Sequence, residues 1–218
     1  MNDAMSSKVL GGTKWKRFAL VMVPTVGIAG AMTVGMANGV LASSFAVSGQ
    51  QFKVSASELD GNVFAQSGTV IVDANGKPHA VAVAGIKSAK IYNMCQSVNV
   101  PVPLLGNLTI VLSAGGGGTP VTATDLVLDT NQVNADATFS GVNIGASAAD
   151  IANKTGIQGF EGYDKTGKPS PFAPGDFGQV VQSAVLKGVT QTAYSTTAGT
   201  MALKGLSISA NLNGHECY

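Results

Sequence analysis

Apolar and polar residues alternate one by one through much of the chain beyond residue 50. In the clearest stretch, the apolar residues Leu206, Ile208, Ala210 and Leu212 are interleaved with the polar residues Ser207, Ser209, Asn211 and Asn213. A period of two places successive side chains on opposite faces, so this pattern predicts half-buried strands. Similar alternation occurs in the segments 70–72, 81–83, 98–102, 108–112 and 125–129.

Two local signals refine this prediction. The segment 73–77 reads Asp-Ala-Asn-Gly-Lys, and Asn-Gly favours a type I′ hairpin turn, in which both residues have positive φ. We therefore expect a hairpin there, with His79 exposed just after it. Residues 147–154 are compatible with a helix, because Ser147 is a suitable N-cap, Asp150 occupies the third position and Gly156 follows.

The expected fold is all-β, built mainly from antiparallel strands, with one N-terminal transmembrane or signal helix. The strands suit a wrapped sheet, a β-helix or a sandwich, and local alternation does not choose between these arrangements. Residues 88–97 resemble residues 183–192, with Ser, Ala and Gln matching. Such similarity is expected of rungs in a β-helix or of equivalent strands in a sandwich.

A basic segment precedes a long charge-free run at the N-terminus. Residues 1–17 hold four basic residues and one acidic residue, and residues 18–42 hold no charge. The positive-inside rule places residues 1–17 in the cytoplasm. The charge-free run is long enough to cross a membrane, which takes about 20 apolar residues.

This run is either a retained single-pass anchor or a secretory signal cleaved after Ala42 or Ala46, where small residues suit a signal peptidase. In both cases residues 43–218 form the exported domain, either at the cell membrane or secreted. If the helix is retained, small residues recur on one of its faces and would let membrane helices pack closely. These residues are Gly27, Ala31, Gly35 and Gly39.

Composition excludes several classes of function. Charged residues are 11% of the 218 residues and the net charge is +1, so no basic field exists to hold nucleic acid. Two histidines are too few for a histidine-built metal site. The acidic residues Asp125, Asp129 and Asp136 match no calcium-binding loop, so we expect them to be solvated turn residues. We expect no metal and no cofactor.

The chain has two cysteines, Cys95 and Cys217. An even number after an export segment indicates one disulfide, because exported chains meet an oxidising environment. The bridge would tie the C-terminus to the middle of the chain. The alternative is two buried free thiols.

Catalytic motifs are weak. A serine hydrolase of the α/β type needs a Gly-x-Ser-x-Gly elbow followed by an acid and a histidine. The nearest stretch, residues 145–149, lacks the second glycine. Ser147, Asp176 and His215 follow one another in the required order, but geometry rather than order defines a triad. We expect His215 to be a surface residue of the last strand.

Several stretches of the chain resemble one family of proteins. They are residues 16–24 (KRFALVMVP), 42–50 (ASSFAVSGQ), 95–97 (CQS), 114–120 (AGGGGTP), 135–139 (ADATF), 191–200 (QTAYSTTAGT) and 216–218 (ECY). The chain is similar, over nearly its whole length, to small exported or membrane-anchored actinomycete (Streptomyces-type) proteins of unknown function. Members are often labelled cholesterol esterase and are commonly encoded beside a small multi-pass membrane protein. The resemblance implies a membrane-associated partner and brings no established catalytic residues.

Two functions are therefore expected. The first is a non-enzymatic cell-envelope β module that binds lipid or a membrane partner, or assembles with itself as a homo-oligomer. The uncharged polar strand faces fit this function, because they protect sheet edges poorly against pairing. The alternative is a lipid esterase of the cholesterol type, as the family label suggests. The missing elbow favours the first function.

Overall fold

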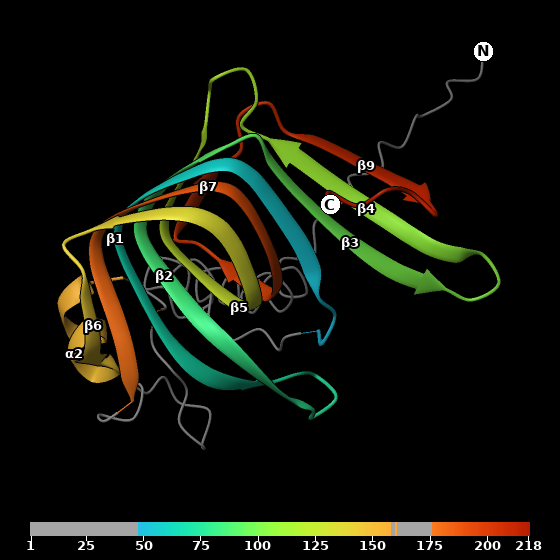
Figure 1. Ribbon diagram of the computed structural model, residues 1–218. Helices are drawn as coiled ribbons and strands as arrows, with labels where there is room; N and C mark the ends of the chain where they lie inside the picture. The colour runs from blue at the N-terminus through green and yellow to red at the C-terminus, as the bar shows by residue number, and fades with distance from the viewer. Residues whose placement is uncertain (1–47, 158–159, 161–175) are drawn as a thin grey trace, which may run out of the picture. The chain divides into compact units, whose positions relative to one another are not determined.

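The computed structural model describes residues 48–157, 160 and 176–218. They lie in the second of the two units into which the chain divides, between Leu41 and Ala42. They form an antiparallel sheet of nine strands, with the helix α2 beside it (Figure 1). The elements are β1 (Phe52–Val72), β2 (Pro78–Tyr92), β3 (Met94–Val102), β4 (Gly106–Ala114), β5 (Val121–Ser140), β6 (Asn143–Ser147), α2 (Ala148–Thr155), β7 (Phe177–Thr197), β8 (Thr200–Ala202) and β9 (Ser207–Leu212). The all-β prediction is confirmed, and the predicted N-terminal helix lies outside the described residues.

Four long strands close into a ring, in which β1 pairs with β2, β2 with β5, β5 with β7, and β7 with β1 again. One circuit through paired residues runs from Gly68 through Ala82, Thr130 and Ala193 to Phe52, which is 16 residues before its start on β1. With a rise of about 3.3 Å per residue and a strand spacing of about 4.8 Å, the strands tilt by about 70° to the ring axis. A strand of 21 residues such as β1 therefore winds about one full turn. Of the three expected arrangements, the domain is a wrapped sheet.

The ring encloses the main core, to which all four of its strands contribute buried side chains. A row of small residues crosses the ring, where Ala89 and Ala184 lie opposite Gly61 and Ala89 also lies opposite Ala123. These small residues make room for a large one, because a Cβ on Gly61 would lie 3.0 Å from Ile86 Cγ2. Small and large interior residues thus fit together to fill the ring.

The similarity between residues 88–97 and 183–192 has a structural counterpart. The two stretches begin on the two strands that pair with opposite edges of β1. Ser88 and Ser183 both lie opposite Asn62, and the alanine after each serine lies opposite Gly61. The matched residues therefore occupy equivalent positions on either side of one strand.

The alternation of apolar residues is interrupted along one row of the ring. Val63 and Asp125 have φ of 52° and 48°, and both stand opposite Lys87 between regular pairs on either side. A residue in this left-handed conformation breaks the alternation of the strand, so that odd-numbered residues can face the core on one side of it and even-numbered residues on the other. On β5 the main core accordingly contains Ala123 before the irregularity and Leu126 after it.

The helix α2 forms where the sequence predicts it. Ser147 is the N-cap, and its hydroxyl accepts a hydrogen bond from the Asp150 amide at 3.3 Å. Gly156 ends the helix in the left-handed conformation at φ 60°. The Lys87 ammonium group fixes this end to the sheet, because it donates to the Gly156 carbonyl at 2.7 Å and pairs with Asp125 at 2.6 Å.

A second, smaller core lies between the outer face of the ring and the segment that contains α2. It buries Ile151, Ile157 and Phe160 against sheet residues that include Val81 and Val83. Phe160 is fully buried and rests directly on Gly85, where a Cβ would lie 2.6 Å from Phe160 Cδ2. Because Gly85 has no side chain, the Phe160 ring can pack directly on the backbone of β2.

A three-stranded arm extends from the ring in the order β3-β4-β9 (Figure 1). It joins the ring where residues 95–97 of β3 pair with residues 53–55 of β1. The terminal strand β9 was expected to be half-buried, but all six of its residues are exposed. It pairs only with β4 within the described residues and stands at the end of the sheet order, away from the ring. The alternation therefore predicted the strand correctly but not its exposure.

Candidate functional site

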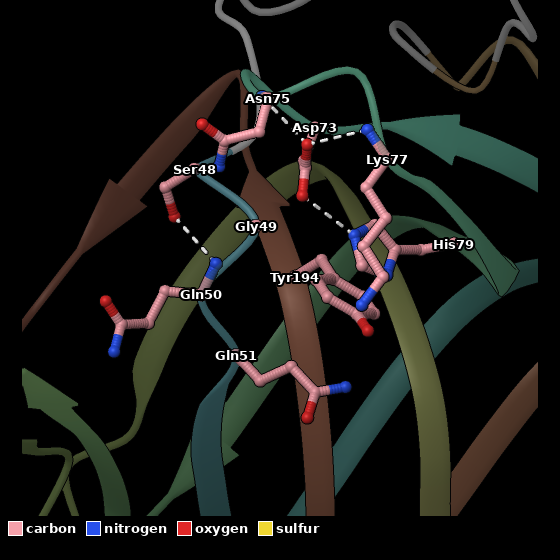
Figure 2. A pocket seen from close by; sticks show the side chains of 9 residues that line it. All are labelled: Ser48, Gly49, Gln50, Gln51, Asp73, Asn75, Lys77, His79 and Tyr194. Carbon is pink, nitrogen blue, oxygen red and sulfur yellow. Dashed lines mark hydrogen bonds and ion pairs between the residues drawn. The ribbon is translucent and has the colours of Figure 1, made fainter.

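Two surfaces of the domain are candidate binding sites: a polar cleft beside the β1–β2 turn and the arm. The first is a polar cleft of about 430 Å³, which we call the hairpin pocket. Its lining residues are Ser48, Gly49, Gln50, Gln51, Asp73, Asn75, Lys77, His79 and Tyr194 (Figure 2). They come from the segment before β1, the β1–β2 turn and β7, which are far apart in sequence but meet because the ring closes.

The turn between β1 and β2 is built around the Asp73 carboxylate. Its Oδ1 accepts hydrogen bonds from the amides of Asn75 at 2.8 Å and Lys77 at 3.0 Å. The Gly76 amide donates to the Asp73 carbonyl, and Gly76 has φ of 80° whereas Asn75 does not have positive φ. The predicted hairpin is confirmed, but its turn is a type I turn followed by a left-handed glycine rather than type I′.

His79 is largely buried, and the expectation that it is exposed is wrong. Its side chain is 10% exposed, and its Nε2 lies 3.0 Å from Asp73 Oδ2. Its ring packs on Tyr194, with the ring centroids 4.5 Å apart. The hydrogen bond from His79 is the main cause that lowers the pKa of Asp73 below its ordinary value, with the amide of Lys77 next. The charge of Asp73 is thus held by the turn and by the imidazole.

The pocket offers polar groups for binding but no nucleophile held by the imidazole. The Ser48 hydroxyl accepts from the Gln50 amide at 3.2 Å and lies across the pocket from His79 (Figure 2). Within the described residues, no group of His, Cys, Asp and Glu side chains is arranged to hold a metal ion. The arrangement of Asp73, His79 and Tyr194 therefore orients an imidazole without placing a hydroxyl on it.

The acidic residues of β5 differ from the expectation that all three are solvated. Asp125 pairs with Lys87, and Asp129 accepts a hydrogen bond from the Ser195 hydroxyl. Burial raises the pKa of Asp129, and the Ser195 hydroxyl partly opposes this shift. Asp136 is exposed, as expected. All three acids lie on β5 rather than in turns, and two of them are fixed by partners on the neighbouring strands β2 and β7.

The second surface is the arm, whose two faces are treated differently. The C-terminal tail covers the polar face over β3 and β4, where Ser97 and Thr109 are buried, and is held by the disulfide between Cys95 and Cys217. The Thr109 hydroxyl also donates to the Gly214 carbonyl at 3.1 Å, and the Cys217 amide donates to the Ser97 hydroxyl at 3.1 Å. The predicted disulfide is present, and it closes the tail onto one side of the arm.

The opposite face of the arm is apolar, half-buried on β3 and β4 and exposed on β9, and we call it the apolar arm face. Cross-strand pairing aligns its residues in rows across the three strands, for example Val98 with Ile110 and Ala210, and Val100 with Leu108 and Leu212. Ile208 and Leu212 are 62% and 53% exposed. At the tip of the β3–β4 hairpin, Leu104 is completely exposed and Leu105 is 59% exposed. Exposed apolar surfaces of this kind are frequent at binding sites, so this face is the second candidate site.

The three residues of the expected triad order lie on different elements. Ser147 caps α2, Asp176 is an exposed residue before β7, and His215 is an exposed residue of the C-terminal tail rather than of β9. No hydrogen bond joins any two of them within the part of the chain that the structure describes. Figure 1 shows α2 and β6 at one end of the domain and the arm, which carries the tail, at the other.

Other expectations concern the N-terminal segment. Gly27, Ala31, Gly35 and Gly39, proposed as a membrane packing face, lie outside the described residues. Within residues 48–157, 160 and 176–218, no helix is long and apolar enough to cross a membrane. Sequence reasoning also missed Tyr194, because only the closure of β7 onto β1 brings it to the pocket.

Comparison with known proteins found one family. The sequence matches DUF6230, a family of unknown function, over residues 48–218. No curated protein and no solved structure matches the chain.

Proposed function

Because the chain belongs to the DUF6230 family of unknown function, we propose a function from its own geometry: a non-enzymatic cell-envelope module that binds lipid through the apolar arm face. The module is displayed outside the cell membrane, either anchored by residues 18–42 or released after signal cleavage. The charge-free run in those residues supports a position at the membrane during export.

The observation that carries this proposal is the contrast between the two faces of the arm. The tail covers the polar face over β3 and β4 and is fastened by the disulfide, whereas no described segment is fastened over the apolar face, whose residues Ile208 and Leu212 are exposed. Leu104 and Leu105 are exposed at the hairpin tip of the same arm. Burying one such leucine in an acyl environment is worth about 1.5–3 kcal/mol, so the tip and face together would hold a lipid or a bilayer surface.

The esterase alternative gains no comparable support. The Ser147 hydroxyl is engaged as the cap of α2, and His79 faces a carboxylate without a hydroxyl in contact. A serine nucleophile needs a base within about 3 Å. Neither Ser147 at the start of α2 nor Ser48 in the hairpin pocket makes a hydrogen bond to a histidine within the described residues. The proposal therefore assigns binding rather than hydrolysis to the domain.

Native mass spectrometry on the full chain, purified from its own membranes in mild detergent, tests this proposal. We expect a lipid-sized adduct on the wild-type protein that is lost in the double variant Leu104→Ser, Leu105→Ser. The matched control is Val70→Ser, Val72→Ser, because these two apolar residues are also exposed, at 61% and 59%, but lie at the end of β1. An adduct that survives the leucine substitutions, or no adduct on the wild type, would overturn the proposal. The mass also shows whether the chain begins at Met1, Ser43 or Val47.

A further inference from the structure

The outer edge of β9 has no partner strand among the residues that the structure describes. The strand stands at the end of the sheet order, pairs there with β4 on one side only, and all six of its residues are exposed. The segment 205–214 holds no charged residue and no proline. Soluble sheets usually protect such edges with lysine, proline or a bulge, because an open row of amides and carbonyls recruits another strand.

The sequence of β9 is complementary to itself in the antiparallel direction. If Ala210 lies on a two-fold axis, Ile208 stands opposite Leu212 of the second copy, and Ser209 stands opposite Asn211 of the second copy. Apolar residues then meet on one face and hydrogen-bonding residues meet on the other, as stabilising cross-strand pairs require. Two-fold symmetry allows this contact to close without leaving a further open edge.

We propose that two copies of this chain pair through their β9 strands, with Ala210 at the two-fold axis. The two arms then form one sheet in which the order β4-β9 continues into β9-β4 of the second copy. The two apolar arm faces become one surface of twice the width. This pairing uses backbone groups at the strand edge, so it does not depend on lipid binding at Leu104 and Leu105.

Another open edge in the domain is less suited to this contact. Beyond Thr130, β5 has no partner on the side of β2 within residues 48–157, 160 and 176–218, and this stretch exposes Val133 and Phe139. It also carries the exposed acid Asp136, and pairing of two copies would bring like charges together. The uncharged strand β9 has no such obstacle.

Cross-linking of the full chain in mild detergent tests the proposal. In the variant Ala210→Cys, the two introduced thiols face each other across the axis, so mild oxidation should give a covalent dimer on a non-reducing gel. Thr138→Cys is the matched control, because it places a thiol on the exposed part of β5, away from the proposed contact, and should give no covalent dimer on the same gel. Cross-linking at Thr138 and not at Ala210 would overturn the proposal, as would capture of a different protein at Ala210.

A charge at the axis gives a second readout. Ala210→Lys places two ammonium groups face to face, and we expect the dissociation constant of the dimer to rise by about tenfold or more. At concentrations below the dissociation constant of the wild-type dimer, its thermal unfolding should match the wild type, because residue 210 is exposed in the single chain. A wild-type monomer would overturn the proposal. A dimer that persists in Ala210→Lys would also overturn it, because association would then come from another surface such as the N-terminal small residues.

Discussion

Gly49 and Asp73 are in contact although the whole of β1 separates them. A Cβ on Gly49 would lie 3.0 Å from Asp73 Cγ, and the backbone there has φ of 77°. The contact follows from ring closure, because Phe52 pairs with Ala193 on β7 and the neighbouring Tyr194 packs on His79 beside the Asp73 turn. The hairpin pocket therefore forms only when the ring closes, so substitutions in the pocket test that closure.

Substitution of Gly49 tests this contact. Gly49→Ala should destabilise the domain both through the positive φ, which disfavours alanine by about 1–2 kcal/mol, and through overlap with the Asp73 carboxylate. Gly76→Ala is the control, because Gly76 has a similar φ of 80° and nothing within 4 Å of a new Cβ. The urea midpoint should fall further for Gly49→Ala. Equal shifts would contradict a contact between the ends of β1.

The lowered pKa of Asp73 predicts a pH dependence. A carboxyl group whose folded pKa lies below its ordinary value of 3.8 stabilises the fold above that pH, and loses this contribution as the pH falls through the folded pKa. Asp73→Asn should therefore have a lower free energy of unfolding than the wild type at pH 5–7, with the gap narrowing below 3.8. Urea unfolding followed by circular dichroism over this range checks the prediction. A gap that is constant down to pH 2.5 would mean that the charge of Asp73 is not involved.

Local features of this fold could be predicted from the sequence because they depend on neighbouring residues. The alternation at 98–102 and 108–112 corresponds to β3 and β4, and the cap residues Ser147 and Gly156 correspond to the ends of α2. The hairpin at 73–77 was predicted correctly, but the predicted turn type was wrong. The Asp73 carboxylate accepts hydrogen bonds from the amides of Asn75 and Lys77 and so favours a different turn.

The ring and the pocket could not be predicted in this way. Pairing of β7 with β1 joins residues more than 100 positions apart, and a period of two states only which face is buried. The irregularities at Val63 and Asp125 switch the buried positions of a strand from odd-numbered to even-numbered residues or the reverse. They therefore interrupt the period-two pattern from which strands are predicted. The similarity of residues 88–97 and 183–192 was the one trace of ring geometry in the sequence, and it was consistent with other folds.

Asp129 should behave in the opposite way to Asp73. Its pKa is raised by burial, so its contribution to stability is greatest below the ordinary value of 3.8 and is lost as the pH rises through the folded pKa. Asp129→Asn removes the buried charge while keeping an oxygen for Ser195, so it should unfold at a higher temperature than the wild type at pH 7. This gain should vanish below pH 3.8. Asp136→Asn, at an exposed position of the same strand, should change neither value.

The packing energy between Phe160 and Gly85 can be measured by a double-mutant cycle. Phe160→Ala should lower the free energy of unfolding by about 3–5 kcal/mol, because a fully buried ring is lost. Gly85→Ala should also destabilise the wild type, since the new Cβ meets the ring at 2.6 Å. In the Phe160→Ala background the same methyl enters the vacated space, so its effect should become smaller or change sign. Additive effects would contradict direct packing between the two residues.

The disulfide should stabilise the domain by restricting the unfolded chain. Cys95 and Cys217 are 122 residues apart, and the chain-entropy estimate for such a loop is about 5 kcal/mol. The double variant Cys95→Ser, Cys217→Ser should therefore unfold at a markedly lower urea concentration, and added reductant should shift the wild type but not the variant. Ser97→Ala is the control for the tail, because it removes only the hydrogen bond to the Cys217 amide and should cost about 1 kcal/mol. If reductant leaves the wild-type midpoint unchanged while free thiols become titratable, the tail is held by its other contacts and the covalent link adds nothing to stability.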